Sequence, residues 1–414
     1  MVVGRSDELA GTRPPPFAAD TCDVRGRRDT DAAGPPHSAG TGLGDISRRG
    51  RGWKAVELRR SDPSSPGIAR RGRGRGFEYF WPSGDKVTDP TVLDRLRGLA
   101  IPPAWRDVWI CQHPNGHLQA VGTDDAGRRQ YLYHPHWRVR RDAAKFDHML
   151  DFARRLADLR AFCVAVLDGR NGLDRERVLA CAVRLLDHGF FRIGTERAVE
   201  EDDPVGLTTI RKEHVSIRSG DTVEFDYPAK GRKRRVQSLA DSSVVEVVGR
   251  LRRRRSGGPE LLAYREGGRW VDVTAADVNE LIKQHCGVES SAKDFRTWNA
   301  TVLAAVALSV SGTLGNATRH RRAITRACRE VAHYLGNTPT VARNSYIDPR
   351  VFDRFSSGWV IDVVSFADEH AGFGVPAYQG ELEKAVLDLL AEDTDAAGVV
   401  AKDELLGDLE EVAS

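Results

Sequence analysis

Beyond residue 141 the chain shows the pattern of helices that bury one face. Apolar residues recur there every three or four positions, in three separate stretches. These stripes are formed by Phe146, Met149, Leu150, Ala153 and Leu156; by Val178, Leu179, Ala182, Leu185 and Leu186; and by Ile324, Ala327, Cys328, Val331 and Leu335. The third stripe stops at Gly336, a residue type that often ends helices. A further amphipathic helix is expected near the C-terminus, with Leu382, Ala385, Val386, Leu389 and Leu390 on its apolar face.

Between Phe77 and Arg141 the pattern changes to short strands and turns. The segments "GHLQAVGTD" and "RRQYLYH" flank the turn "DAG", which predicts a β-hairpin. Because strand side chains alternate, Arg129, Tyr131 and Tyr133 share one face of the second strand. Two aromatics and a cation on one face suit a nucleic-acid backbone or base edges, although a half-buried edge strand has the same pattern.

A second, smaller sheet is expected between the helical stripes. Its strands are "GLTTI", "VSI" and "TVEFDY", joined by the polar turns "RKEH" and "RSGD". The last strand runs into "PAKGRKRRV", which predicts a hairpin tip with Lys230 beside Gly231.

These patterns predict an α+β fold. A small N-terminal antiparallel β-sheet domain would cover residues 65–141, and a mainly helical domain with a small three-stranded sheet would cover 142–391. Residues 1–64 are rich in Gly, Pro, Arg and Ser and predict a disordered extension. Residues 392–414 predict a flexible acidic tail.

The net charge of +3 hides an uneven distribution. Residues 381–414 carry eleven acidic and two basic side chains, a balance of −9, so the other 380 residues balance at +12. A basic body of this kind indicates a polyanionic partner, with nucleic acid first. The six cysteines form no CxxC pair, which favours reduced thiols in a cytosolic protein over a disulfide framework. No apolar run is long enough to span a membrane, and no secretory signal is readable.

The sequence offers little for a metal or a nucleotide cofactor. Zinc needs four convergent ligands, and the grouping of Cys111, His113 and His117, followed by His134 and His136, has no recognised zinc spacing. The DxD pairs at Asp29/Asp31 and Asp393/Asp395 lie in polar tails, where charges are usually only solvated. There is no GxxxxGK[ST] motif, and the glycines of "GRGRG" follow no predicted strand.

What remains is a set of cations and one tyrosine, in the segments "FFRIGTE", "PAKGR", "KDFRTWNAT" and "GNTPTVARNSYI". At these residues the chain resembles the type IB DNA topoisomerases, in the compact form of bacteria and poxviruses. The resemblance extends to "IPPAWRDVWIC", "NGHLQAVGTDDAGRRQYLYHP", "VGLTTIRKEHV" and "LGNTPTVARNSYIDP", in the family's order, and covers roughly residues 64–360. It implies the family's catalytic fold, which tyrosine recombinases share.

The resemblance implies a role for each of these residues, and the roles suit their chemistry. Tyr346 would attack a DNA phosphodiester and keep the bond energy in a 3′-phosphotyrosine. Arg192 and Arg296 would bind the non-bridging oxygens of the transition state. Lys230 would protonate the leaving 5′ oxygen as general acid. The scheme needs no cofactor, neither ATP nor a metal.

Two positions depart from the family pattern. Asn337 stands where many members have histidine; its amide can still donate a hydrogen bond to a phosphoryl oxygen, but it carries no charge. Around the lysine the usual small-residue turn is "PAKGR" here, and Lys233 on the same hairpin competes with Lys230 for the role of general acid.

For DNA holding, the resemblance implies Gln130, Tyr131 and Tyr133 on the N-terminal sheet, with Arg129 on the same strand. Such contacts to phosphate and sugar position a protein without reading much sequence. The expected partner is double-stranded DNA, bound by a monomer that has no membrane attachment and lies in the cytoplasm with the nucleoid.

Two alternatives use the same residues. A tyrosine recombinase or integrase has the same chemistry, but usually shows HxxR at the second arginine, where this chain has Lys293. A DNA-binding protein without catalysis would have lost a site position, and only the change from histidine to asparagine is present. Finally, the long extension and the position of Val56 suggest an alternative start near that residue, which mass spectrometry of the native N-terminus would test.

Overall fold

A computed structural model describes residues 57–74, 76–194, 205–218, 221–230, 233–311, 317–366 and 379–405. Predictions for residues 1–56, for Ser219 and Gly220 of the "RSGD" turn, for Gly231 of the hairpin tip and for the end of the acidic tail therefore lie outside the described residues. The chain divides into two compact units between His134 and Pro135. This division lies ahead of Arg141 because helix α2 (Pro135–Gly169) begins there, and its main contacts are with α3, α5 and α6 of the second unit.

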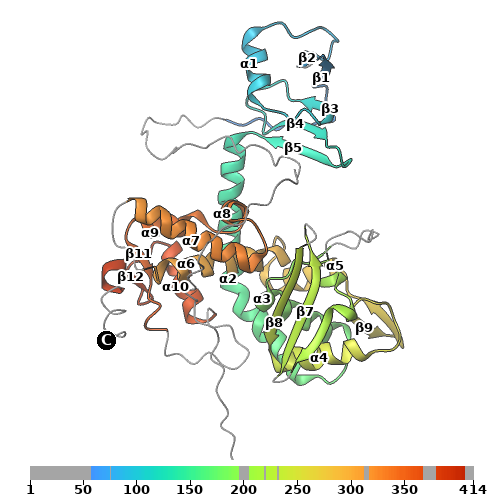
Figure 1. The fold of residues 1–414 in the computed structure, drawn as a ribbon, viewed down its shortest axis with the longest axis vertical. Helices are drawn as coiled ribbons and strands as arrows, with labels where there is room; N and C mark the ends of the chain where they lie inside the picture. The colour runs from blue at the N-terminus through green and yellow to red at the C-terminus, as the bar shows by residue number, and fades with distance from the viewer. Residues whose placement is uncertain are drawn as a thin grey trace, which may run out of the picture. The chain divides into compact units, whose positions relative to one another are not determined.

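The first unit is a five-stranded antiparallel sheet with one helix. Its strand order is β2-β1-β3-β4-β5, so β2 and β5 are the edges (Figure 1). The strands are β1 (Ile68–Arg73), β2 (Gly76–Phe80), β3 (Arg106–Ile110), β4 (Leu118–Thr123) and β5 (Arg129–Tyr133), and the helix is α1 (Pro90–Gly98). The expected hairpin is confirmed as β4 and β5, with Asp124 bonded across the turn to Arg128. A compact core that includes Ile68, Leu96 and Ile110 joins the sheet to α1.

The sequence predicted a disordered extension up to residue 64. This prediction is wrong for the last residues of that range. Arg59 forms a β-bridge with Gly116, and the backbone N–H of Ser61 donates to Nδ1 of His117 at 2.9 Å. The reason is that the loop before β4 leaves backbone groups without strand partners, and residues 57–61 supply them.

The second unit is mainly helical, as predicted, and its core is one large apolar cluster. Its helices are α2, α3 (Arg175–Gly189), α4 (Ser242–Arg253), α5 (Ala275–Cys286), α6 (Ala292–Ser309), α7 (Ala317–Leu335), α8 (Pro339–Ser345), α9 (Pro349–Ser356) and α10 (Glu381–Leu390). The three expected stripes are confirmed as buried faces of α2, α3 and α7, and the C-terminal stripe as that of α10. Helix α6 is buried along nearly its whole length and forms the centre of the unit.

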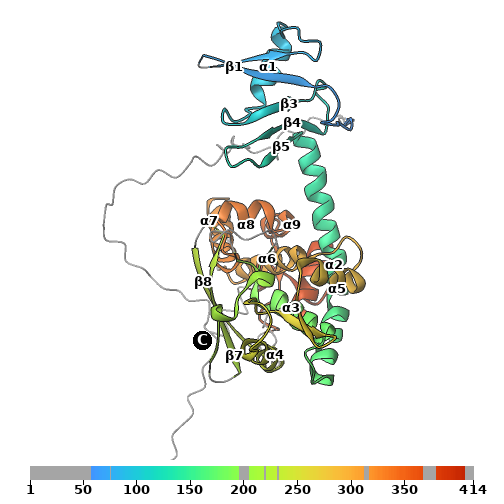
Figure 2. The same ribbon diagram turned by 90° about the vertical axis from the view of Figure 1, so that its right-hand side faces the viewer.

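A three-stranded antiparallel sheet is present, but its strands differ from the expected set. The order is β6 (Val215–Arg218), β7 (Thr222–Ala229) and β8 (Lys233–Ala240), with α3 and α4 packed on one face (Figures 1 and 2). The segment "GLTTI" is instead a 3-10 turn at Leu207–Thr209, followed by another at Lys212–His214. It cannot pair as a strand because Leu207 and Thr208 donate their N–H groups to the carbonyls of Arg192 and Ile193. A separate hairpin, β9 (Ala263–Glu266) and β10 (Arg269–Asp272), packs beside α3.

The acidic tail begins later than expected. Strand β12 (Val399–Ala401) pairs with β11 (Trp359–Ile361), and Leu405 is fully buried. Lys402, only 3% exposed, donates from Nζ to the carbonyls of Leu308 and Ser309 at the C-terminal end of α6. The prediction of a flexible tail from residue 392 is therefore wrong up to residue 405, because valines and a buried lysine anchor this segment.

None of the helices in the described part of the chain is both long and apolar enough to cross a membrane.

Candidate active site

Arg192 is held on a short loop by backbone contacts on both sides. Helix α3 ends at Gly189, and Phe190 takes a left-handed backbone conformation with φ of 53°, which redirects the chain. The carbonyl of Arg192 then accepts the N–H of Leu207 at 2.7 Å, and that of Ile193 accepts the N–H of Thr208 at 2.9 Å. The 3-10 turn therefore fixes the backbone from which the Arg192 side chain extends.

Gly206 allows this contact because it has no side chain. A Cβ atom built on Gly206 would lie 2.3 Å from the Cα of Gly194 and 2.9 Å from the carbonyl oxygen of Arg192. Both neighbours are backbone atoms, so neither can rotate away. The close approach, and with it the position of Arg192, requires glycine at residue 206.

The resemblance described above implies that Arg192 is catalytic in the relaxation of supercoiled DNA; we therefore expect Gly206→Ala to slow this relaxation by about 100-fold, since a displacement of roughly 1 Å at a catalytic group has that effect. Gly169→Ala is the matched control, because a Cβ there meets no atom within 4 Å. The measurement is the rate of plasmid relaxation by both variants. Equal rates for Gly206→Ala and the wild type would contradict the role given to this contact.

Arg296 lies on the buried helix α6 and connects two loops of the site. Its terminal nitrogens donate to the carbonyl of Phe190 and, at 2.8 Å, to the carbonyl of Leu335. Its Nε is buried and has no hydrogen-bond partner in the described structure. Burial, together with the neighbouring charge of Arg192, lowers the pKa of Arg296 to about 10. A buried cation without a carboxylate partner is a strong attractor for an anion.

Asn337 follows directly on the end of α7. Gly336 ends that helix with φ of 61°, as predicted, and the N–H of Asn337 returns to the carbonyl of Ala332 at 2.9 Å. The side-chain Oδ1 of Asn337 accepts a hydrogen bond from Nη2 of Arg192. Because arginine can only donate, this contact turns Nδ2 of Asn337 the other way, and that buried nitrogen has no hydrogen-bond partner among the residues that the structure describes.

Tyr346 lies at the end of a short helix that begins beside Asn337. Thr338 caps the N-terminus of α8 with its side chain, Pro339 occupies the first turn, and Tyr346 is the C-terminal cap residue. The guanidinium carbon of Arg296 lies 5.3 Å from the centre of the Tyr346 ring. Burial alone raises the pKa of Tyr346, but the charges of Arg296 and Arg192 outweigh it and hold that pKa below its usual value.

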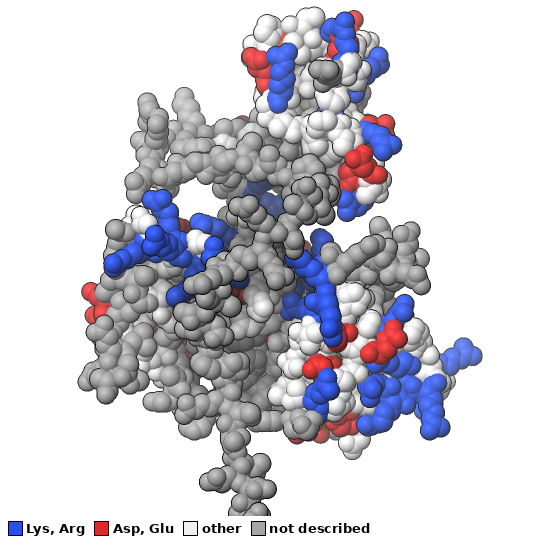
Figure 3. Space-filling view, viewed as in Figure 1, with Lys and Arg blue, Asp and Glu red and all other residues white. Residues whose placement is uncertain are grey.

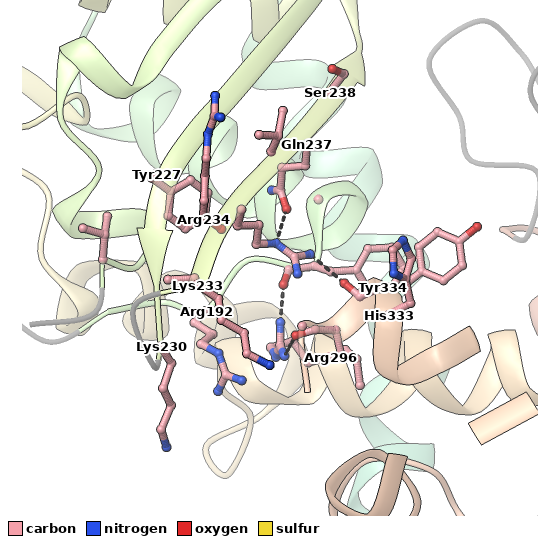
Figure 4. A pocket seen from close by; sticks show the side chains of 18 of the residues that line it. Arg192, Tyr227, Lys230, Lys233, Arg234, Gln237, Ser238, Arg296, His333 and Tyr334 are labelled. Atoms are coloured by element: carbon pink, nitrogen blue, oxygen red, sulfur yellow. Dashed lines mark hydrogen bonds between the residues drawn. The ribbon is translucent and has the colours of Figure 1, made fainter. Parts of the chain in front are cut away.

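Lys230 lies in the exposed turn between β7 and β8. In Figure 4 its side chain extends from the end of the hairpin, away from the arginines in the pocket. Lys233 begins β8 and is also exposed. A cavity of about 300 Å³ is lined by Arg192, Lys230, Arg296 and Tyr346, whereas Lys233 lines only the neighbouring cavity. Lys293, the position that departs from HxxR, lines the smaller cavity too.

The neighbouring cavity, of about 520 Å³, is lined by a half-buried arginine, Arg235, that the sequence analysis did not single out. Nη2 of Arg235 donates to the carbonyl of Tyr334 and Nε to Oε1 of Gln237, both at 2.6 Å (Figure 4). Arg235 therefore supports the C-terminal end of α7 just before Asn337. The signal in the sequence was an inverted strand pattern: along β8 the half-buried positions are Arg235 and Gln237, while Val236 is 52% exposed.

The expected DNA-binding residues of the first unit lie on edge strand β5. Arg129, Tyr131 and Tyr133 alternate with Gln130 and Leu132, and the rings of Tyr131 and Tyr133 stack with centroids 6.3 Å apart. Tyr131 is 46% exposed. Gln130 is not brought onto this face: its Nε2 donates to Oδ2 of Asp124 in the hairpin turn at 2.8 Å.

The residues of "CQHPNGH" serve the first unit in other ways. Arg95 donates to the backbone carbonyls of Cys111, Gln112 and His113, which organises the loop before β4. No group of three or more His, Cys, Asp or Glu side chains that could hold a metal ion occurs among the described residues.

Comparison with known proteins agrees with this arrangement. The model of the catalytic core of eukaryotic DNA topoisomerase I matches residues 134–356, more than half of the 414 residues, and that of the N-terminal domain of bacterial DNA topoisomerase IB matches residues 76–124. The chain is 27% identical over 292 residues to DNA topoisomerase 1B of Acanthamoeba polyphaga mimivirus, covering 68% of this chain and 85% of the relative. It is 23% identical over 288 residues to DNA topoisomerase 1B of Vaccinia virus (strain Copenhagen), covering 67% of this chain and 86% of the relative. These matches favour a topoisomerase over a recombinase, and the chain belongs to the type IB DNA topoisomerase family.

Proposed function

We propose that the protein relaxes supercoiled DNA by cutting one strand, forming a 3′-phosphotyrosine and resealing the strand, without ATP or a metal ion. The observation that carries this proposal is the cavity in which Tyr346 lies with Arg192, Arg296 and Lys230. Such a gathering of a nucleophile and cations fits a reaction at a phosphodiester. Every role in the reaction then belongs to a side chain of the protein.

The nucleophile is the hydroxyl of Tyr346. Its attack on phosphorus forms a phosphotyrosine and releases the 5′ oxygen of the next nucleotide, so the number of phosphate ester bonds does not change. The lowered pKa of Tyr346 favours loss of its proton as the attack begins. Resealing is the reverse attack by the 5′ hydroxyl, which explains why no external energy source is needed.

Arg192, Arg296 and Asn337 stabilise the charge that develops on the non-bridging oxygens. Arg296 offers its unpartnered Nε and Asn337 its unpartnered Nδ2, and Arg192 connects to Asn337 by a hydrogen bond. Donors that are buried and already oriented stabilise a transition state without further reorganisation. Asn337 thus supplies a neutral hydrogen bond where many relatives of this family have a histidine.

Lys230 is the general acid for the leaving 5′ oxygen, and Lys233 is the alternative. Lys230 is favoured because it lines the same cavity as Tyr346. Its place in an exposed turn fits entry into a DNA groove, where it would reach the leaving oxygen.

The DNA duplex is held by Arg129, Tyr131 and Tyr133 on β5, with Gln130 contributing from the turn side of the same strand. In the second unit we propose a further contact, the arginine face of α7, formed by Arg322, Arg326 and Arg329. These exposed residues follow one another at spacings of four and three and share the face opposite the buried stripe. Figure 3 shows Lys and Arg gathered over this part of the molecule, near α7 and α9 of Figure 1.

The arginine face has few acidic neighbours. Among the described residues, its ion pair joins Arg326 to Glu330 at 3.8 Å. Like charges spaced by four on a helix repel one another, so this face destabilises the helix in the absence of DNA. A bound polyanion would relieve that repulsion. From Arg322 to Arg329 it spans about 10 Å at 1.5 Å per residue, on the helix that ends at Leu335, just before Asn337. It is therefore placed to follow a phosphate backbone toward the site.

We expect replacement of Arg322 and Arg329 by glutamine to reduce the salt dependence of DNA binding. The slope of the logarithm of the binding constant against the logarithm of the salt concentration should become less steep by about 2, because each lost phosphate contact lowers the magnitude of this slope by about 0.9. The measurement is equilibrium binding to a duplex at several salt concentrations. Arg154→Gln, on the exposed face of α2, is the control. An unchanged slope in the double variant would remove α7 from the DNA interface.

The function itself is tested with supercoiled plasmid, in EDTA and without ATP. Relaxation is expected, together with a covalent protein–DNA adduct on the 3′ side of the nick. An adduct on the 5′ side, or no relaxation, would contradict the proposal. A requirement for two specific DNA sites would indicate a recombinase instead.

A further inference from the structure

The backbone on both sides of Tyr346 is held by side chains from distant helices. Oγ1 of Thr301 in α6 donates to the carbonyl of Thr297 at 2.8 Å, lies 3.4 Å from the carbonyl oxygen of Tyr346, and accepts the N–H of Asp348 at 3.1 Å. On the other side, Nζ of Lys145 in α2 donates to the carbonyl of Ser345 at 2.5 Å. Thr301 lies within the helix that carries Arg296, whereas Lys145 has no part in the reaction proposed above.

Lys145 is in an unusual environment for a lysine. It is half-buried, its ammonium lies 4.2 Å from the centre of the Phe146 ring, and none of the described carboxylates forms an ion pair with it. Burial and then the charge of Lys293 lower the pKa of Lys145 to about 8, against the opposing effect of Asp142, Asp294 and Asp348. Lysines are usually exposed, and burying this one without a salt bridge costs free energy of folding. A cost of this kind points to a functional reason for the contact.

Lys145 binds the C-terminal end of α8, the short helix that carries Tyr346. Helix α8 has only seven residues, too few to be stable alone, and its last carbonyls have no partner within the helix. A cation at the C-terminal end of a helix satisfies such a carbonyl and interacts favourably with the helix dipole. Ser345, whose carbonyl is bound, directly precedes Tyr346.

We propose that Lys145 is a positioning residue for the nucleophile, whose ammonium fixes the end of α8 so that the Tyr346 hydroxyl meets the phosphorus in line. Lys145 touches neither DNA nor the reacting atoms in this scheme. Lys145 holds the carbonyl of Ser345 before Tyr346, and Thr301 holds the N–H of Asp348 after it, so the backbone that carries the tyrosine is restrained on both sides. The inference rests on the proposed function, because it assumes that Tyr346 is the nucleophile.

The test compares Lys145→Met, Lys145→Arg and the wild type in plasmid relaxation. Methionine keeps the apolar stem and removes the donor, whereas arginine keeps a cation that can bind a carbonyl. We expect Lys145→Met to lower kcat by about 10- to 100-fold with unchanged KM for plasmid, since misplacing the nucleophile slows the chemical step alone. Lys145→Arg should recover most of the loss. Arg154→Met, on the exposed part of α2, is the control and should behave as the wild type.

Three results would overturn the inference. Relaxation by Lys145→Met within about twofold of the wild-type rate would mean that the hydrogen bond is irrelevant to the chemical step. An increase in KM with unchanged kcat would make Lys145 a DNA contact. Equal losses in the methionine and arginine variants, with lowered melting temperatures in both, would make it a folding residue. Absence of relaxation by the wild type would instead contradict the proposed function, and this inference with it.

Discussion

Tyr346→Phe is expected to abolish plasmid relaxation and to eliminate the covalent protein–DNA adduct. The substitution removes one oxygen atom, the atom that attacks phosphorus in the proposed reaction. The proposed mechanism gives the role of nucleophile to no other hydroxyl of the described residues. Loss of a nucleophile lowers rates by more than about 10⁴-fold, which places relaxation below detection. The phenylalanine ring keeps the apolar contacts of Tyr346 with the core cluster, so the fold and DNA affinity should stay unchanged.

The matched control is Tyr334→Phe. Tyr334 also lies near the site and lines the larger cavity, but it is 43% exposed and its backbone carbonyl, rather than its hydroxyl, makes the contact to Arg235. This variant should relax plasmid at the wild-type rate. Relaxation by Tyr346→Phe, or an adduct that persists in it, would show that another residue is the nucleophile and would reject the proposed mechanism.

The short helix that carries Tyr346, the proposed nucleophile, was predictable from sequence in detail. Gly336 as helix end, Thr338 as cap and Pro339 in the first turn are local signals, and each acts through the backbone of its own neighbours. The helical stripes were predictable for the same reason, because a period of 3.6 residues needs no knowledge of the partner that covers it. Local rules therefore gave the segment of Tyr346 correctly.

The contacts that support the site were not predictable, because they join segments far apart in the chain. Lys145 and Ser345 are 200 residues apart in the sequence. The close backbone contact between Gly206 and Gly194 depends on where two loops meet. "GLTTI" has the composition of a strand, yet tertiary hydrogen bonds to Arg192 and Ile193 make it a 3-10 turn. The acidic composition of the tail likewise gave no indication that Val399 and Lys402 are buried, because their burial depends on β11 and α6.

The identity of the general acid can be decided by the leaving group. Lys230→Ala is expected to slow cleavage of ordinary DNA by about 10²- to 10⁴-fold, since an alkoxide leaves poorly unless it is protonated. A duplex with sulfur in place of the 5′ bridging oxygen at a mapped cleavage site releases a thiolate, which is stable without a proton. On that substrate Lys230→Ala should cleave at nearly the wild-type rate, whereas variants that misplace the nucleophile or the arginines, such as Lys145→Met and Gly206→Ala, should stay slow.

Lys233→Ala is the control in the same experiment, and it discriminates between the two lysines of the hairpin. Lys233 lines only the larger cavity, without Tyr346, so its loss should change cleavage by no more than a few-fold with either leaving group. The opposite outcome, a large loss in Lys233→Ala that sulfur restores, would transfer the role of general acid to Lys233. If sulfur restores neither variant, both lysines act by binding DNA, and the proton for the 5′ oxygen comes from elsewhere. The sulfur substitution thus distinguishes a lysine that transfers a proton from one that only binds DNA, a distinction that the exposure of both side chains does not make.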